Sequence, residues 1–465
     1  MNHYAIILAA GKGTRMKSKR NDLCKAATPI LGVPMVQWVM QAVKPLGVDS
    51  FVTVVGFAGE SVKKIVENES DVVWQSEQKG TAHAVNAASA ILEGKEGVTF
   101  LLPADRPLLT TKTLKAMRNA HEANHNVLTL LTAVVDDPRG YGRIIRDGNG
   151  LVDVKSDGEC SLEEKAKKEV SIGVYLVDNI ELFAAMKELP SGARGEYHLS
   201  DLVRYFLHNG KKVSTFAISD SEEAMGVNDR VQLAEASAIL QERICKKWML
   251  NGVTIEDPRT TYISPSVEIG ADTIIRPNTF LRGKTVVGEN NVIGPDTYLE
   301  DVEIGDDNII EYCHFTETKV GNRTTLGPYL RTRKGVEIGD EAHIGNFNEL
   351  KNVTFGKGSK CAHLSYLGDA SIGEGVNIGC GSIIANYDGV NKFHSEIGDH
   401  AFIGSGTILI SPVKIEENGF TAAGSTIHMD VPAHAMAIAR TRQINKEGYA
   451  DVFHEKAVEK KKAKK

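Results

Sequence analysis

Apolar and polar residues follow two different rhythms along the chain. Up to residue 228, short apolar runs such as 4–8 alternate with segments of helical spacing, and the segment 34–47 opens with a proline at a favourable helical position. Strands that alternate with helices in this way predict a largely parallel sheet that is covered on both faces. We therefore expect residues 1–228 to form an α/β domain of Rossmann-like type.

A period of six residues begins near residue 251. Its first members are Ile269, Ile275, Leu281, Val287, Ile293 and Leu299. After short phase breaks, aliphatic–glycine pairs continue the pattern as far as Ile403 and Gly404. This period fits neither a helix nor simple alternation. It is typical of a β-helix, in which each hexapeptide forms one flat side and three sides make a coil of about 18 residues. Residues 251–454 are therefore predicted to form such a β-helix.

Two further segments complete the predicted organisation. Residues 229–250 carry apolar residues at helical spacing with charges between them, which predicts a helix that joins the two domains. Residues 455–465 form a basic run, which we expect to be solvated and disordered, while assistance to an anionic ligand is the alternative.

Composition and charge narrow the possible partners. The chain is 42% hydrophobic and 25% charged, and its net charge of −6 gives no general attraction for nucleic acid or anionic membranes. No apolar run approaches the roughly 18 residues of a membrane span, and the apolar start is too short for a signal peptide. The six cysteines are scattered without a CxxC pair. Reduced thiols in a cytoplasmic protein, with no disulfide framework or zinc site, are therefore expected.

A glycine-rich turn, LAAGKGTRM at residues 8–16, follows the first predicted strand. Gly11 and Gly13 allow the backbone to approach phosphates closely, Thr14 adds a hydroxyl, and Arg15 adds positive charge. Backbone amides at the start of a helix then form an anion cradle. The spacing is that of neither the Walker A loop nor the dinucleotide fingerprint. With Lys25 nearby in the sequence, the turn predicts a phosphate-binding site.

This turn resembles the signature loop of the sugar-1-phosphate nucleotidylyltransferases. Because hexapeptide repeats follow it, nearly the whole chain resembles the bacterial bifunctional N-acetylglucosamine-1-phosphate uridylyltransferase/glucosamine-1-phosphate acetyltransferase family. Further motifs that carry the resemblance are QSEQKGTAHA, DPRGYGRI, GEYHLSD, GVNDR, GNFNELK, AHLSYLGD and ANYDGVNKF. The resemblance implies a nucleotidyltransferase domain, a left-handed parallel β-helix and a homotrimer. It also implies synthesis of UDP-N-acetylglucosamine, by acetyl transfer from acetyl-CoA and then uridylyl transfer from UTP with release of pyrophosphate.

For the first domain the resemblance implies catalytic roles for Lys25 and Arg15 and Mg²⁺ ligation by Asp105 and Asn228. A hard metal with oxygen ligands suits nucleotidyl transfer, which depends on positioning and charge neutralisation. A helix-capping carboxylate is the alternative role for Asp105. The nucleotide sugar is expected to contact Leu8, Ala9, Ala10, Gly11, Gly13, Thr14, Gln75, Gly80, Thr81, Gly140, Ser156, Ser171 and Asn228.

Several residues of this domain depart from the family pattern. Cys24 replaces a proline, three residues are inserted around 19–21, and Ala104 replaces a glycine. Ser156 and Ser171 stand where a Glu and an Asn are expected to contact the sugar. An acetyltransferase whose first domain has weak or altered sugar-phosphate specificity is therefore the alternative function. A non-catalytic scaffold of the same two domains is a third interpretation, which the Asp105/Asn228 pair and His363 disfavour.

The second site is expected around His363, which the resemblance assigns as the general base that deprotonates the amine of glucosamine-1-phosphate. Imidazole suits this task because its ordinary pKa of about 6.5 leaves it mostly neutral at physiological pH. A packed or interfacial histidine is the alternative. The amino-sugar phosphate is expected to contact Arg333, Lys351, Tyr366 and Asn377. Acetyl-CoA is expected to contact Cys380, Asn386, Tyr387, Ser405, Ala423 and Arg440.

Overall fold

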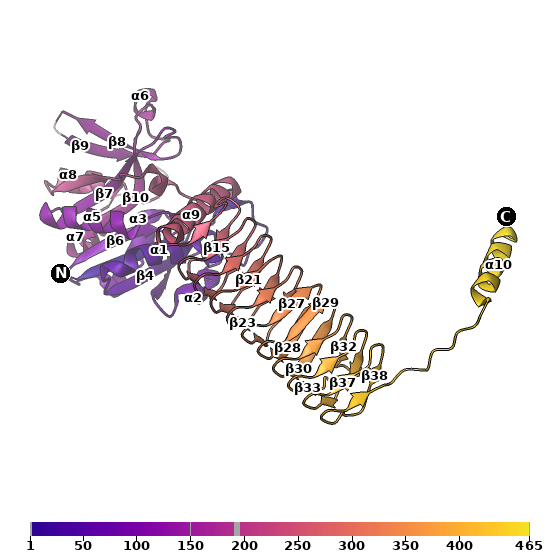
Figure 1. Ribbon diagram of the computed structural model, residues 1–465. Coiled ribbons are helices and arrows are strands. Elements are labelled where there is room, and N and C mark those ends of the chain that lie inside the picture. Colours follow the sequence, from indigo (N-terminus) through magenta and orange to yellow (C-terminus); the bar gives the residue numbers. More distant parts are fainter. Residues whose placement is uncertain (1, 149, 190–195, 465) are drawn as a thin grey trace. The chain divides into compact units, whose positions relative to one another are not determined.

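The computed structural model describes residues 2–148, 150–189 and 196–464 (Figure 1). The chain divides into two compact units. The first contains residues 1–247 and 262–265, and the second contains residues 248–261 and 266–465.

The first unit is built on one mixed sheet. The main strands, in spatial order, are β11 (Val213–Ala217), β7 (Leu128–Val134), β10 (Glu169–Asp178), β6 (Val98–Pro103), β1 (His3–Ala9), β4 (Ser50–Val55) and β5 (Asp71–Trp74). Pairing is parallel except at β10, which runs antiparallel to both neighbours. The chain reaches β10 through the antiparallel hairpin β8 (Gly142–Asp147)–β9 (Gly150–Lys155) and not through a long crossover helix. The predicted, largely parallel sheet is confirmed, with β10 and the hairpin β8–β9 as its antiparallel part.

Helices cover both faces of the sheet, as predicted. One buried cluster packs β1 and β7 against α3 (Thr81–Asn86), α4 (Ser89–Leu92), α7 (Asn179–Met186) and α8 (Asp201–His208). Two others lie under α1 (Met35–Val43), α2 (Glu60–Val66) and α5 (Thr111–Ala123). Fully buried side chains such as Ile6 and Phe100 anchor these layers, so the strand ends at the sheet edge have fixed positions.

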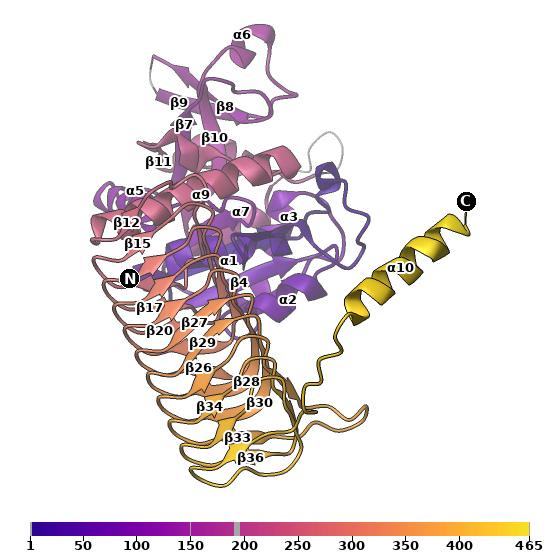
Figure 2. The same ribbon diagram turned by 45° about the vertical axis from the view of Figure 1, so that its right-hand side comes forward.

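The second unit is the predicted left-handed β-helix, whose stacked coils are plain in Figure 2. One of its flat sides begins with β12 (Thr254–Ile255), β15 (Ile274–Ile275) and β18 (Val292–Ile293) and ends with β39 (Met436–Ala437). Successive coils pair in parallel, as where Ile274 lies opposite Val292. The aliphatic residues of the six-residue period are buried, which confirms that this period marks the inward positions.

The corners of the β-helix use left-handed backbone conformations. One set of corners, which we call the first corner column, contains Asn278, Asp296, Tyr312, Tyr329, Phe347, Leu364, Gly381, Gly406 and Gly424, all with positive φ. Backbone hydrogen bonds link successive corners: Leu364 N–H donates to Asn346 O over 2.9 Å, and Gly406 N–H donates to Cys380 O over 2.7 Å. Side chains in this column therefore stack one coil above the next.

Two helices correspond to the two segments that were predicted to lie between and after the domains. Helix α9 (Arg230–Leu250) covers the segment predicted as a joining helix. The basic tail, expected to be disordered, instead forms most of helix α10 (Tyr449–Lys462), and that expectation was wrong. Alanine, glutamate and lysine, which have high helix propensity, fill this segment, and no proline interrupts it. The expected exposure to solvent is confirmed, because none of its residues is buried.

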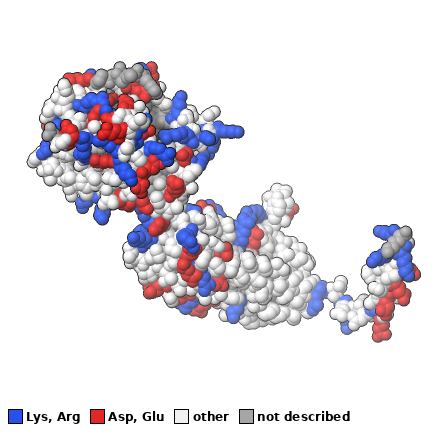
Figure 3. All heavy atoms as spheres, turned by 90° about the horizontal axis from the view of Figure 1, so that it is seen from above, with Lys and Arg blue, Asp and Glu red and all other residues white. Residues whose placement is uncertain are grey.

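Two predictions about composition can be compared with the fold. None of the six cysteines forms a disulfide, and five of them are buried. Among the residues that the structure describes, no helix combines the length and the apolar character needed to cross a membrane. In the view of Figure 3, positive and negative side chains are interspersed over the first unit, with no extended patch of one sign.

Candidate active sites

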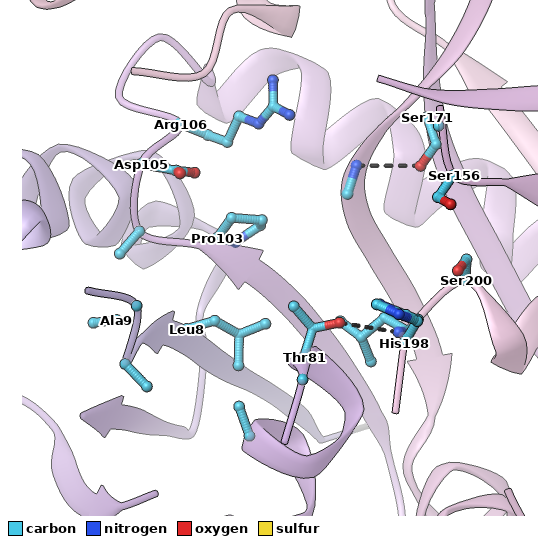
Figure 4. A pocket seen from close by; sticks show the side chains of 18 of the residues that line it. Leu8, Ala9, Thr81, Pro103, Asp105, Arg106, Ser156, Ser171, His198 and Ser200 are labelled. Atoms are coloured by element: carbon cyan, nitrogen blue, oxygen red, sulfur yellow. Dashed lines mark hydrogen bonds between the residues drawn. The ribbon is translucent and has the colours of Figure 1, made fainter. Parts of the chain in front are cut away.

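A cavity of about 640 Å³ lies at the carboxyl ends of β1 and β6 (Figure 4). Ligands of open α/β sheets bind at this edge, because loops there present backbone and side chains around one crevice. Many of the residues predicted for the nucleotide sugar line it, together with Lys25 and Asp105. These predicted residues are Leu8, Ala9, Ala10, Gly11, Gln75, Gly80, Thr81, Gly140, Ser156 and Ser171.

Gly13 and Thr14 line a second, smaller hollow of about 180 Å³ beside the first. Gly13 has φ of 59°, and a Cβ there would lie 2.7 Å from Cβ of Lys25, so no other residue fits without displacement. Lys25 lines both hollows. The glycine therefore lets the loop close against the lysine that separates the two cavities.

Lys25 and three other predicted residues form one cluster. Lys25 Nζ lies 2.5 Å from Oδ2 of Asp105 and 3.4 Å from Oδ1 of Asn228, and Arg15 Nη2 donates to the same Asn228 oxygen over 2.8 Å. Burial alone would raise the pKa of the Asp105 carboxyl. The cations of Lys25 and Arg106 outweigh burial and hold that pKa below its usual value. Asp105 is therefore a carboxylate at neutral pH, surrounded by positive charge.

The donor set of this cluster fits a magnesium ion. Asp105 Oδ2 and Asn228 Oδ1 both face the Lys25 ammonium, so a carboxylate oxygen and an amide oxygen lie around one cation. Oxygen ligands of this kind are those that Mg²⁺ prefers. Among the described residues, no group of three or more His, Cys, Asp or Glu side chains could hold a metal. A metal bound here would thus take its remaining ligands from substrate phosphates and water.

Cys24, which replaces the expected proline, is accommodated by its surroundings. Its backbone N–H, which a proline would lack, donates to Ser61 Oγ over 3.0 Å, and its Sγ donates to Ala9 O over 3.3 Å. Burial raises the pKa of this thiol. Cys24 therefore fastens the glycine-rich turn to α2 as an unreactive, protonated thiol.

Three residues predicted to contact the nucleotide sugar, Gln75, Gly80 and Thr81, lie beside the loop 196–200. Gln75 is buried, and its amide donates to Gly80 O over 3.0 Å. A Cβ on Gly80 would lie 2.4 Å from Tyr197 O, and Thr81 Oγ1 accepts a hydrogen bond from Leu199 N–H over 3.0 Å. This loop is therefore held directly against the start of α3.

Both serines that replace sugar-binding residues are engaged in local hydrogen bonds. Ser156 donates to Glu159 through Oγ over 2.7 Å and through its N–H over 3.0 Å. Ser171 Oγ accepts from Gly173 N–H over 3.3 Å. The side chains still line the cavity, next to those of His198 and Ser200 in Figure 4. Sugar contacts must therefore also come from neighbouring groups.

Several polar cavity residues were missed by the sequence analysis, and six of them matter for the chemistry of the site. They are Arg106, Tyr141, Asp157, Glu196, His198 and Ser200. The last three belong to the motif GEYHLSD, which was singled out only for its resemblance and whose Gly195 lies outside the described residues. A buried guanidinium on Arg143 pairs with Asp157 over 2.8 Å and holds that carboxylate at the cavity wall. No signal in the local sequence marks this long-range pair.

The second candidate site lies on the β-helix around His363. The residue ends β29 (Lys360–His363), which pairs with β27 (His343–Asn346), and its ring is exposed. Its Nδ1 lies 2.9 Å from Asn346 Oδ1. Since an amide oxygen only accepts, we assign the proton to Nδ1, which leaves Nε2 free to accept a proton. This arrangement fits a general base.

Positive charge gathers near His363 on the neighbouring flat side. Arg333 follows β25 (Arg331–Thr332), and Lys351 lies on β28 (Glu349–Phe355). A hydrogen bond and charge repulsion from the ammonium of Lys392 lower the pKa of Lys351, so the two lysines are close. Lys392 was also missed, although it belongs to the motif ANYDGVNKF. Together these cations can receive a phosphate.

Tyr366 and Asn386 converge above one glycine. A Cβ on Gly368 would lie 2.6 Å from the Tyr366 hydroxyl and 2.8 Å from the Asn386 amide nitrogen. Asn386 is buried and donates to Asp369. Tyr387, in contrast, is exposed on a small hairpin that it forms with Lys392. This hairpin explains the break in the six-residue period, because Asn377 pairs with Phe402, 25 residues away.

Three residues predicted for acetyl-CoA lie in line with His363. Each precedes a member of the first corner column, as His363 precedes Leu364; they are Cys380, Ser405 and Ala423. All three are exposed. Arg440, also predicted for acetyl-CoA, lies beyond β39 and is exposed. Asn377, predicted for the amino-sugar phosphate, pairs with Lys360, which lies three positions before His363 in β29. The structure of one chain thus aligns most of the predicted groove but leaves Asn377 apart from the base.

Comparisons with known proteins agree with both halves. Residues 4–249 match the Nucleotidyl transferase family. Over 453 residues the chain is 48% identical to the bifunctional protein GlmU of Geobacillus sp. (strain WCH70), covering 97% of this chain and 98% of that protein. The bifunctional protein GlmU of Brevibacillus brevis (strain 47) is 46% identical over 450 residues, covering 96% and 97%. A solved UDP-glucose pyrophosphorylase complexed with UDP-glucose covers 52% of this chain at 19% identity and a TM-score of 0.43.

Proposed function

The chain belongs to the GlmU family of bifunctional proteins, and we propose which of its residues perform each of the two reactions. It is an enzyme of UDP-N-acetylglucosamine synthesis, with glucosamine-1-phosphate acetyltransferase and uridylyltransferase activities. A scaffold without catalytic activity is thereby excluded, and a first domain of altered specificity is not favoured.

Uridylyl transfer takes place in the cavity of the first unit. A phosphate oxygen of N-acetylglucosamine-1-phosphate attacks the α-phosphate of UTP, and pyrophosphate leaves. The turn at Gly11 and Gly13 holds the triphosphate, while Lys25 and Arg15 neutralise its charge. Mg²⁺, held by Asp105 and Asn228, would supply further charge neutralisation and orient the phosphates. The observation that supports this assignment is the chain of hydrogen-bond contacts that links the four side chains: Asp105 and Asn228 both contact Lys25, and Arg15 contacts Asn228.

Acetyl transfer takes place at His363. Its Nε2 accepts a proton from the 2-amino group of glucosamine-1-phosphate as the amine nitrogen attacks the thioester carbonyl of acetyl-CoA. The new C–N bond forms, the C–S bond breaks, and the proton ends on the sulfur of CoA. Arg333, Lys351 and Lys392 receive the sugar phosphate. The single observation that carries this assignment is the Nδ1 contact with Asn346, which orients the exposed ring and leaves its Nε2 side open to the substrate.

Acetyl-CoA lies along the line from His363 through Cys380, Ser405 and Ala423. The corners beside these residues are Gly381, Gly406 and Gly424, so no corner side chain projects there. Exposed apolar side chains border this strip on both adjoining sides, including Ile383, Ile408 and Phe402. A narrow strip without corner side chains, bordered by apolar residues, suits an extended pantetheine arm.

A homotrimer and a cytoplasmic location belong to the same proposal. Tyr312, Tyr329 and Phe347 form an exposed aromatic ridge on the first corner column, with ring centroids 5.5 and 5.2 Å apart. Contiguous exposed apolar surface of this kind marks protein interfaces. Light scattering should give the mass of three chains, and the free cysteines fit a reducing compartment.

The experiment that tests the two activities uses the purified full chain. Glucosamine-1-phosphate and acetyl-CoA should release CoA, and the product with UTP and Mg²⁺ should release pyrophosphate. A panel of other sugar-1-phosphates measures specificity. CoA release without pyrophosphate release from N-acetylglucosamine-1-phosphate would contradict the assignment of the first site.

The two sugar-site serines give a prediction about affinity. Restoring Ser156→Glu and Ser171→Asn together is expected to lower the KM for N-acetylglucosamine-1-phosphate about tenfold, which corresponds to roughly 1.4 kcal/mol. Longer polar side chains reach the sugar, whereas both serines are held locally. Steady-state kinetics measures the effect, and the KM for UTP should not change. Equal sugar KM values in parent and double variant would mean that other cavity residues already replace these contacts.

A further inference from the structure

The first corner column changes character at His363. From Tyr312 to Leu364 the corners carry large exposed side chains, and the side chain of Leu364, the last of them, is 60% exposed. After it, the corners are Gly381, Gly406 and Gly424. The column therefore has a step, and the last large residue stands directly next to His363 in the sequence.

Leu364 has a backbone conformation that is unfavourable for leucine. Its φ is 46°, in the left-handed region that glycine, asparagine and aspartate adopt most readily. The same column begins with Asn278 and Asp296, which suit this conformation. A leucine in that conformation gains little from burial, since most of its side chain is exposed. The fold imposes this conformation at every corner of the column, so the backbone alone does not account for a leucine here.

The position of Leu364 relates it to the acyl group. Gly381 N–H donates to His363 O over 3.4 Å, which places the first glycine corner one coil after Leu364. A thioester that follows Cys380, Ser405 and Ala423 toward His363 has its carbonyl carbon at the base. The acyl chain continues beyond the carbonyl in the same direction. It therefore meets the Leu364 corner, which lies in the same coil as the base and ends the run of glycine corners.

We propose that Leu364 is the specificity-determining wall that ends the acyl-CoA groove and restricts the transferred group to two carbons. The proposal rests on the acetyl-CoA assignment made above. The reaction itself is unchanged: the amine nitrogen bonds to the acyl carbon, the C–S bond breaks, and the proton passes to the CoA sulfur. Leu364 contributes only the space available to the carbons beyond the carbonyl.

The test compares acyl donors in the full chain. Leu364→Gly extends the glycine strip by one coil, and glycine relieves the positive φ, so the variant is expected to fold. We expect the ratio of kcat/KM for butanoyl-CoA to that for acetyl-CoA to rise at least about tenfold, since each methylene in an apolar pocket changes discrimination by roughly that factor. Asn418→Gly, at an exposed corner of another column with φ of 54°, is the matched control and should leave the ratio unchanged.

A second variant keeps the test decisive if Leu364→Gly loses all activity. Leu364→Phe fills more of the space and should lower kcat/KM for acetyl-CoA at least about tenfold, while the KM for glucosamine-1-phosphate and the mass of the assembly stay the same. An unchanged donor ratio in an active Leu364→Gly, or full acetylation by Leu364→Phe, would overturn the wall. If the parent protein acetylates nothing, the acetyl-CoA assignment itself fails, and the wall fails with it.

Discussion

Replacing His363 by alanine is expected to lower acetyl transfer to glucosamine-1-phosphate by about two to four orders of magnitude, the range for a lost general base. The imidazole is exposed and held through Nδ1 by Asn346, so its removal takes away the proton acceptor without opening the core. Release of CoA, followed with a thiol reagent, measures the effect. Uridylyl transfer should be unchanged.

A histidine elsewhere on the same β-helix gives the matched control. His394 is also exposed and makes one side-chain hydrogen bond, to Ser371 over 2.9 Å. His394→Ala should leave both activities at the parental level. Near-parental acetylation by His363→Ala would return His363 to a packing or interfacial role.

Replacing Asp105 or Asn228 by alanine should lower pyrophosphate release by at least about a thousandfold. Each change removes one of the two oxygens that converge on the cation position, and several kcal/mol of charge stabilisation correspond to that factor. Acetyl transfer should persist, because its residues lie in the second unit. A coupled phosphatase assay detects the pyrophosphate.

Asp22→Ala is the control for removal of an aspartate from the same unit. Asp22 is exposed and pairs with Arg20, 2.9 Å away, and it lines neither cavity. Its loss should leave pyrophosphate release unchanged. Should both activities fall together in Asp105→Ala, the substitution acts on folding, and thermal melting would reveal it.

The β-helix could be predicted from the sequence because burial acts on every coil in the same way. An inward residue recurs at each flat side, so Ile275, Leu281 and Ile293 report the architecture without long-range information. The tail was wrongly predicted because its charge pattern outweighed the helix propensity of its alanine, glutamate and lysine residues. The antiparallel β10 was also not foreseen, since strand direction depends on which strands become neighbours.

In the candidate sites, too, features formed by neighbouring residues could be predicted and contacts between distant residues could not. The glycine-rich turn is local, so its role as a phosphate cradle could be predicted from nine residues. The pairing of Lys25 with Asp105 and Asn228 joins residues 80 and 203 positions apart, and only the family resemblance brought them together beforehand. Lys392 and Asp157 were missed because their importance comes from Lys351 and Arg143, which reach them only in the folded chain.

The first corner column also has a consequence for how the β-helix opens. Coils of a solenoid contact only their neighbours, so the terminal coils lose their amide protection most readily. The corners Gly381, Gly406 and Gly424 lie in the coils nearest the end of the β-helix. Occupation of the groove should therefore slow hydrogen exchange there and leave the coils near Ile275 unaffected. The amide exchange rate of each coil should therefore report how far along the β-helix the bound thioester extends.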